Sequence, residues 1–330
     1  MIDSYNRNIN YLRISVTDRC NLRCTYCMPK EGLSAIGHED ILRYEEIVRI
    51  VEVAARMGIA KVRVTGGEPL VRRGIVEFMA RLSAIAGLND ISLTTNGVML
   101  ADFAAPLYKA GVKRINISLD SLNKEKYARI TRGGELASVL AGIEAVHREG
   151  FFPIKLNVVV IKGVNDDELL DFALLSLNNP YQIRFIELMP MGTAGLCHES
   201  NYLSNTVIFE GINRVYPLKP VQYEKRIVDG PASMFKIDGA QGEIGFISPI
   251  SHHFCNSCNR LRLTSDGYLR ACLLDDNDIS LKDALRQGCS DEDLQLLIGG
   301  AISGKPKEHE IVRDESHVRK CVKEMSSLGG

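Results

Sequence analysis

The chain has 330 residues, of which 45% are hydrophobic, and a formal net charge of −1. This length predicts one large or two modest domains, and the near-neutral charge gives no indication of a nucleic-acid or membrane partner. No apolar run approaches a membrane span, and the first 20 residues lack an apolar signal region. We therefore expect a cytoplasmic protein, in which the nine cysteines are metal ligands or buried thiols rather than disulfides.

Short apolar strands alternate with amphipathic helical patterns through the first two thirds of the chain. We predict strands near 10–17, 61–65, 90–95, 114–119, 154–161 and 182–188, and helices near 44–57, 73–86, 100–110, 135–149 and 166–178. Parallel strands need such helical crossovers, and no dinucleotide-binding fingerprint follows the first strand. The pattern therefore predicts an α/β fold, a partial (β/α)6 TIM-like barrel with its active-site groups at the carboxyl ends of the strands.

After about residue 220 the pattern changes to short strands and turns. We expect strands at 233–237 and 243–248, a hairpin over 260–273 and a helix near 280–287. The sequence thus predicts two domains, a barrel over 1–220 and a C-terminal extension over 221–330.

Three cysteines, Cys20, Cys24 and Cys27, lie in the stretch CNLRCTYC, directly after the first predicted strand. Three thiolates can hold a [4Fe–4S] cluster and leave one iron without a protein ligand. A zinc site completed by His38 is the alternative, but zinc sites usually pair their cysteines as CxxC. The spacing therefore favours an open iron–sulfur cluster.

From about residue 10 to 190 the chain resembles the radical S-adenosylmethionine enzymes, which share the CxxxCx(aromatic)C motif. In that superfamily S-adenosylmethionine chelates the open iron and is cleaved to a 5′-deoxyadenosyl radical, which removes a hydrogen atom from the substrate. The stretch GGEP at 66–69, after the second predicted strand, resembles a further motif of the superfamily. The resemblance implies S-adenosylmethionine contacts from Tyr26, Gly67, Ser118 and Met189, although ordinary core packing accounts for Met189 almost equally well.

A second group of cysteines, Cys255, Cys258 and Cys272, again supplies three thiols. By itself this group could form a zinc ribbon completed by His252 or His253. Its spacing resembles the C-terminal motif of the GTP 3′,8-cyclase family of molybdenum cofactor synthesis, which extends the resemblance over nearly the whole chain. The resemblance implies a second [4Fe–4S] cluster whose open iron faces the guanine of GTP. The remaining cysteines have no partner at ligand spacing: Cys197, Cys289 and Cys321.

A nucleoside triphosphate is a polyanion, so its pocket needs cations. The stretch GGAISGKP at 299–306 approaches a P-loop, but Pro306 replaces the required Ser or Thr, and we reject it as a phosphate site. Arg13 and Arg63 alternate with apolar residues and would point into the barrel, unless they are merely solvated strand charges. The resemblance implies GTP contacts from Arg13, Arg63, Thr94, Lys155, Arg260, Leu261 and Arg262.

The final residues Gly329 and Gly330 match the paired glycines that end chains of this family and reach toward the active site; a disordered terminus is the alternative. The resemblance implies cyclisation of GTP to (8S)-3′,8-cyclo-7,8-dihydroguanosine 5′-triphosphate, the first step of molybdopterin synthesis. It also implies a flavodoxin- or ferredoxin-type electron donor and transfer of the product to the cyclic pyranopterin monophosphate synthase, and a homodimer is compatible with it. Two rival interpretations are a radical peptide-modifying enzyme and a non-catalytic zinc-binding module.

Overall fold

Six consecutive parallel strands form the body of the protein. The computed structural model describes residues 1–34, 36–191, 199–222, 230–309, 313–314, 317–318 and 328–329. The six strands are β1 (Tyr11–Ser15), β2 (Lys61–Thr65), β3 (Asp90–Thr95), β4 (Arg114–Ser118), β5 (Ile154–Val160) and β6 (Tyr181–Glu187). Each pairs in parallel with the next along the chain. The α/β barrel arrangement predicted from the sequence is confirmed.

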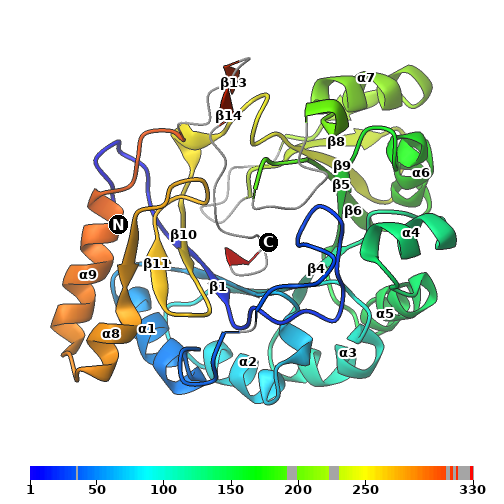
Figure 1. Ribbon diagram of the computed structural model, residues 1–330. Helices are drawn as coiled ribbons and strands as arrows, with labels where there is room; N and C mark the ends of the chain where they lie inside the picture. Colours follow the sequence, from blue (N-terminus) through cyan, green and yellow to red (C-terminus); the bar gives the residue numbers. More distant parts are fainter. Residues whose placement is uncertain are drawn as a thin grey trace.

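Helices connect these strands and cover the outer face of the sheet (Figure 1). They are α1 (Tyr44–Arg56), α2 (Ile75–Ser83), α3 (Leu100–Lys109), α4 (Lys124–Thr131), α5 (Leu136–Arg148) and α6 (Leu169–Asn178). In α1 the buried residues Ile47, Ile50 and Val51 recur at the three- and four-residue spacing of one helix face. Among the described residues, no helix has the length and apolar character needed to cross a membrane.

The last third of the chain adds strands to both edges of this sheet. β10 (Arg260–Leu263) lies parallel beside β1, and β9 (Glu243–Ile247) lies parallel beside β6. The outer strands are β11 (Tyr268–Arg270), β12 (Asp278–Ser280), β8 (Ser233–Ile237) and β7 (Leu218–Pro220), so that twelve of the described strands form one sheet. The division into two domains at residue 220 stays a prediction, and the strands on either side of that point share one sheet.

Three further α-helices and two short strands of the described chain lie outside this sheet. They are the helices α7 (Asn205–Val215), α8 (Leu281–Arg286) and α9 (Asp291–Ser303), and the short strands β13 (Arg313–Asp314) and β14 (His317–Val318).

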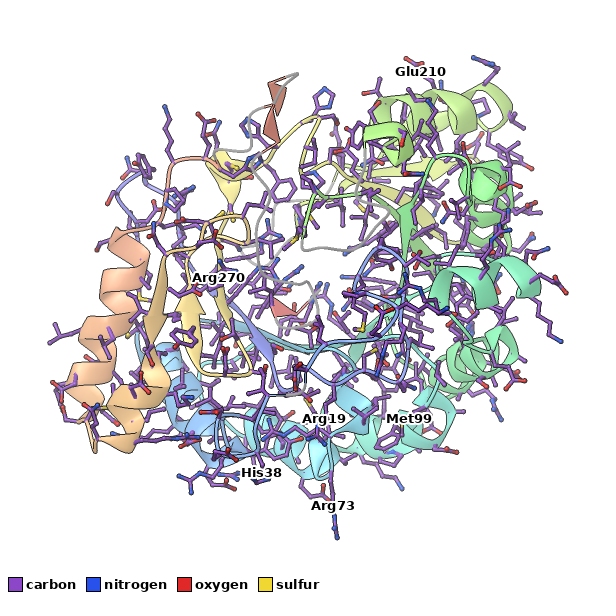
Figure 2. The ribbon with its side chains drawn as sticks, in the orientation of Figure 1. Arg19, His38, Arg73, Met99, Glu210 and Arg270 are labelled. Atoms are coloured by element: carbon purple, nitrogen blue, oxygen red, sulfur yellow. The ribbon has the colours of Figure 1, made fainter. Side chains whose placement is uncertain are left out.

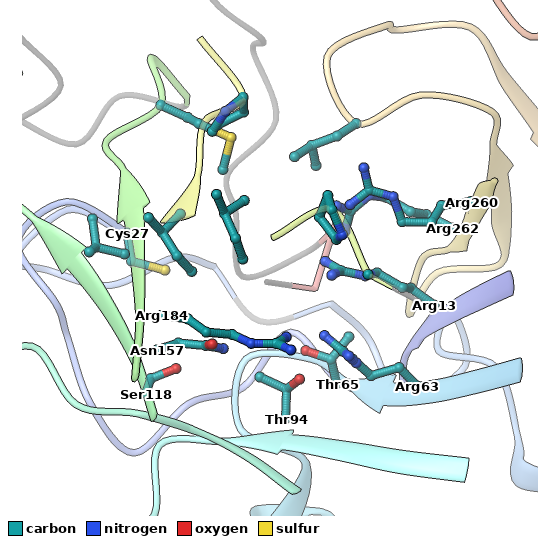
Figure 3. Close-up of a pocket in the computed structure, with 18 of the residues that line it drawn as sticks. Arg13, Cys27, Arg63, Thr65, Thr94, Ser118, Asn157, Arg184, Arg260 and Arg262 are labelled. Carbon is teal, nitrogen blue, oxygen red and sulfur yellow. The ribbon is translucent and has the colours of Figure 1, made fainter. Parts of the chain in front are cut away.

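Successive side chains along β1 and β2 point to opposite faces of the sheet, and the two faces have different environments. Leu12 and Val62 belong to the apolar core between sheet and helices, whereas Arg13 and Arg63 point into the barrel (Figure 3).

Candidate active site

A cavity of about 290 Å³ lies at the carboxyl ends of the strands, inside the curved sheet. Figure 3 shows Cys27 across this cavity from Arg260 and Arg262, with Arg184 and Thr94 between them. Most of the site residues predicted from the sequence line it: Arg13, Cys20, Cys24, Tyr26, Cys27, Arg63, Gly67, Thr94, Ser118, Met189, Cys255, Cys258, Arg260, Arg262 and Cys272. The fold therefore brings both cysteine groups and the predicted cations to one space.

The loop after β1 holds the first three thiols close together. The Cys27 N–H donates to the Cys24 carbonyl over 3.0 Å, which places these two residues in one turn. Burial raises the pKa of Cys24 well above its ordinary value, and Cys27, Asp120 and Cys20 raise it further. Three thiolates that repel one another in this way need a positive group between them. The donor set fits an iron–sulfur cluster.

A single zinc ion fits these thiols poorly. Within the described ranges, no three His, Cys, Asp or Glu side chains are placed to share one metal ion. His38, the alternative fourth ligand, is exposed and does not line the cavity (Figure 2). A four-iron cluster takes its three thiolates at separate irons and does not require them to converge on one point.

The aromatic residue of the first motif is fixed by a carboxylate. The Tyr26 hydroxyl donates to Asp120 Oδ2 over 2.6 Å, and Asp120 Oδ1 accepts from the Val159 N–H over 2.9 Å. Burial raises the pKa of Asp120 to about 6, although the two hydrogen bonds stabilise the carboxylate and by themselves lower the pKa. Tyr26 is thereby held at the wall of the cavity, which Ser118 at the end of β4 also lines.

Gly67 lies against the backbone that leads into the cysteine loop. Its N–H donates to the Thr17 carbonyl over 2.7 Å, and an added Cβ would lie 2.4 Å from the Arg19 carbonyl oxygen. The next residue, Glu68, is fully buried and accepts hydrogen bonds from the Thr95 hydroxyl and from two backbone N–H groups. The GGEP stretch therefore joins the ends of β2 and β3 to the first cysteine loop.

The second three thiols lie around the short 3-10 helix η4 (Cys255–Ser257) and the hairpin of β10 and β11. Burial raises the pKa of Cys255, and Cys272 and Cys258 raise it further. Burial also opposes ionisation of Cys258, but Arg260 and Lys305 outweigh it and lower the pKa of that thiol to about 6. The site thus supplies three neighbouring thiols, one of them ionised at neutral pH, which fits a second cluster.

Five arginines line the same cavity: Arg13, Arg63, Arg184, Arg260 and Arg262. The one carboxylate side chain among the described lining residues is Asp120, which already accepts from Tyr26. Cations enclosed in this way are costly unless an anion binds between them. The cavity is therefore built for a polyanionic ligand.

Arg184 was missed in the sequence analysis. It is buried, its Nη2 donates to Gln182 Oε1 over 3.0 Å, and its Nε has no hydrogen-bond partner within the described residues. Burial lowers the pKa of Arg184 to about 9, and Arg63 and Arg114 lower it further. The signal was present in the stretch QIRFIEL, where a charge alternates with apolar residues as it does around Arg13 and Arg63.

Some predicted residues lie elsewhere. Lys155 is buried in β5 but does not line the cavity, and Leu261 packs in the apolar core on the opposite face of β10. A GTP contact from Leu261 would therefore have to come from its backbone. Gly329 lies inside the curved sheet, whereas Gly330, Cys197 and Cys321 are outside the described residues.

Comparisons with known proteins cover the whole chain. Residues 14–175 match the family model of the radical SAM superfamily, and residues 181–311 match the model named Molybdenum Cofactor Synthesis C. The chain is 50% identical over 330 residues to GTP 3′,8-cyclase of Moorella thermoacetica, with 100% of both chains covered. It is 47% identical to GTP 3′,8-cyclase of Listeria monocytogenes, over 99% of this chain and 98% of that one.

Solved structures share the fold at low identity. SuiB of Streptococcus suis bound to the precursor peptide SuiA has a TM-score of 0.60 and 13% identity, covering 90% of this chain and 67% of that one. Methylornithine synthase has a TM-score of 0.51 and 18% identity, covering 64% of this chain and 63% of that one. These likenesses concern the fold alone.

Proposed function

The chain belongs to the GTP 3′,8-cyclase family of the radical S-adenosylmethionine superfamily, and on that premise we propose that it cyclises GTP to (8S)-3′,8-cyclo-7,8-dihydroguanosine 5′-triphosphate. This reaction is the first step of molybdenum cofactor synthesis. The observation that carries the proposal is one cavity lined by two three-cysteine groups and five arginines. A zinc-binding module would need neither the arginines nor the placement of both groups at the strand ends.

Two [4Fe–4S] clusters would be held by the two cysteine groups, Cys20, Cys24 and Cys27 for the first and Cys255, Cys258 and Cys272 for the second. Each set supplies three thiolates and leaves one iron open to a small-molecule ligand. When bound, the first cluster and S-adenosylmethionine supply the carbon radical that starts the reaction. Tyr26, Gly67, Ser118 and Met189 border the same cavity, and we assign S-adenosylmethionine contacts to them.

The arginines would bind and orient the triphosphate. A charge-assisted hydrogen bond contributes about 1.5–3 kcal/mol. Micromolar affinity corresponds to about 8 kcal/mol, so a few such contacts are sufficient. Thr94 would add a polar contact, since its buried hydroxyl lines the cavity and has no partner in the described part of the chain. GTP held in this way would lie between the two cysteine groups, which line the same cavity.

Family membership supports two further assignments. We infer a flavodoxin- or ferredoxin-type protein as electron donor and the cyclic pyranopterin monophosphate synthase as the enzyme that receives the product. A homodimer and a cytoplasmic location stay predictions.

A radical peptide-modifying enzyme is the second candidate, since SuiB, which binds a peptide, shares the fold. The cavity disfavours it, because five arginines against Asp120 suit a compact polyanion better than a peptide.

Isotope transfer tests the proposal. GTP deuterated at C3′ should pass its label to 5′-deoxyadenosine, while GTP deuterated at C8 should keep its label in the cyclised product. ATP serves as the control and should give no cyclised product. Absence of transfer from C3′, or equal turnover with a peptide, would contradict the proposal.

A further inference from the structure

Residues 305–307 follow α9 and Gly304 in the chain, and they lie close to the second cysteine group. Lys305 and Pro306 of this segment end the stretch GGAISGKP, which approaches a P-loop in sequence and was left without a role. Lys305 is 3% exposed, so its ammonium must find partners inside the protein. Its hydrogen-bond partners are two backbone carbonyls close in sequence to Cys258 and Cys272.

The Lys305 ammonium joins the backbone beside two of the three cysteines. It donates to the Arg260 carbonyl over 2.9 Å and to the Ala271 carbonyl. Arg260 lies two residues after Cys258, and Ala271 directly precedes Cys272. One side chain thereby fixes the distance between the ligand-bearing ends of β10 and β11.

Arg7, from the N-terminal segment, joins the third cysteine to the same residues 305–307. Its Nη1 donates to the Cys255 carbonyl and to the Lys307 carbonyl, each over 3.0 Å, and its Nη2 donates to the Pro306 carbonyl over 2.7 Å. Asp3 holds the guanidinium from the other side, with Nε and Oδ2 separated by 2.6 Å. The Arg7 and Asp3 side chains are 4% and 0% exposed.

A buried cation that donates hydrogen bonds to several carbonyls restricts the positions of the loops that carry them. Loss of either side chain would leave buried carbonyl oxygens without donors, and the loops would have to move to find new ones. A cluster with three protein ligands depends strongly on such support, because no fourth ligand closes the set. Residues 305–307 are therefore placed to hold all three ligand-bearing loops at once.

We propose that Arg7 and Lys305 are positioning residues for the second cluster, and that residues 305–307 are the common segment through which they fix the backbone at Cys255, Cys258 and Cys272. The inference rests on the second cluster of the proposed function. It assigns the GKP sequence to a structural task, in which Lys305 donates to carbonyls instead of phosphate.

Iron analysis of two variants tests this inference. Arg7→Gln and Lys305→Met are reconstituted anaerobically, and iron per chain is measured together with the electron paramagnetic resonance spectrum. The wild type should hold ~8 iron and each variant ~4, with the second cluster's signal lost. Reductive cleavage of S-adenosylmethionine should persist in both variants, because the first cysteine group is untouched.

Controls with the same side-chain types come from helix α8, which follows the second cysteine group in the chain. Arg286→Gln removes a guanidinium that also donates to backbone carbonyls, of Glu39 and Ile41, and Lys282→Met removes an ammonium bound to Asp40. Neither residue lines the cavity, and both controls should keep ~8 iron.

Three outcomes separate the possibilities. Full iron content in Arg7→Gln and Lys305→Met would overturn the inference. Equal loss of both clusters would also overturn it, because the two residues would then support the fold in general. A wild-type protein with only ~4 iron would instead contradict the second cluster itself.

Discussion

Arg262 Nη1 donates a hydrogen bond of 2.7 Å to the Gly329 carbonyl inside the curved sheet. An arginine that lines the cavity thus also holds Gly329 in place. Gly329 has a φ of 76°, and an added Cβ would lie 2.4 Å from Thr65 Cγ2. Only glycine has both the conformational freedom and the small size that this position requires.

Deleting Gly329 and Gly330 is expected to stop product formation, since the segment that contacts Arg262 is removed. Both clusters and GTP binding should persist, because none of their proposed ligands is lost. Chromatographic assay of the cyclised product and equilibrium binding of GTP provide the measurements. Gly329→Ala should act in the same direction, with Gly288→Ala as the control, since Gly288 has a φ of 81° and no neighbour within 4 Å. Full activity of the truncated chain would contradict this role.

Tyr11 lines the cavity among cations. Lys61, Arg63 and Arg13 lie 4.9, 5.6 and 5.7 Å from its ring centroid. Burial opposes ionisation of the phenol, but Arg63, Arg13 and Lys61 outweigh it and lower the pKa of Tyr11 to about 7. Above that pH the phenolate places a negative charge where the triphosphate would bind.

GTP affinity is therefore expected to depend on pH through Tyr11. A phenol that must regain its proton before the anion binds weakens binding about tenfold per pH unit above its pKa. Tyr11→Phe should remove this contribution, so the variant should bind GTP more tightly than the wild type at alkaline pH. Titration calorimetry in two buffers would also detect the proton taken up by the wild type. Equal pH profiles for the two proteins would exclude the effect.

Arg184→Gln is expected to weaken GTP binding by about 2 kcal/mol, since it removes one charge-assisted contact. The iron content should not change, because Arg184 contacts neither cysteine group through a hydrogen bond. Equilibrium binding of GTP by the anaerobic protein provides the measurement, and Arg214→Gln, on the exposed surface of α7, is the control. Unchanged affinity would remove Arg184 from the substrate site.

Cys24→Ser is expected to abolish cleavage of S-adenosylmethionine, because two thiolates cannot hold the first cluster in an open geometry. The variant should keep ~4 iron in the second cluster. Cys289→Ser is the control, since Cys289 packs against the apolar core, away from both groups. Continued release of 5′-deoxyadenosine by Cys24→Ser would contradict the first cluster.

The order of β1 to β6 could be predicted because each strand and its crossover helix are local patterns. The pairing of β1 with β10 could not, since it joins Tyr11 to Arg260 and leaves no periodic signal in either segment. Helix α4 was also missed: its sequence KEKYARIT is short and largely polar, and Asn123 caps its start by accepting from the Lys126 N–H.

The site residues likewise divide into those that the sequence could predict and those that it could not. The cysteines were identifiable from their spacing, which is set by cluster chemistry. Leu261 was included because the family resemblance implies a GTP contact there, although strand alternation directs its side chain to the opposite face. Arg184 could have been identified from the same alternation, in the stretch QIRFIEL.

The pairing of β1 with β10 also constrains how the protein is made. During synthesis the six barrel strands emerge long before their outer neighbours β9 and β10, so both edges of the sheet have unpaired N–H and C=O groups. Exposed edges of this kind promote aggregation of incomplete chains. A fragment ending near residue 220 would retain Cys20, Cys24 and Cys27 but leave β1 open on one side. Metal loading should accordingly follow completion of the chain, once β10 has paired with β1 and β9 has paired with β6.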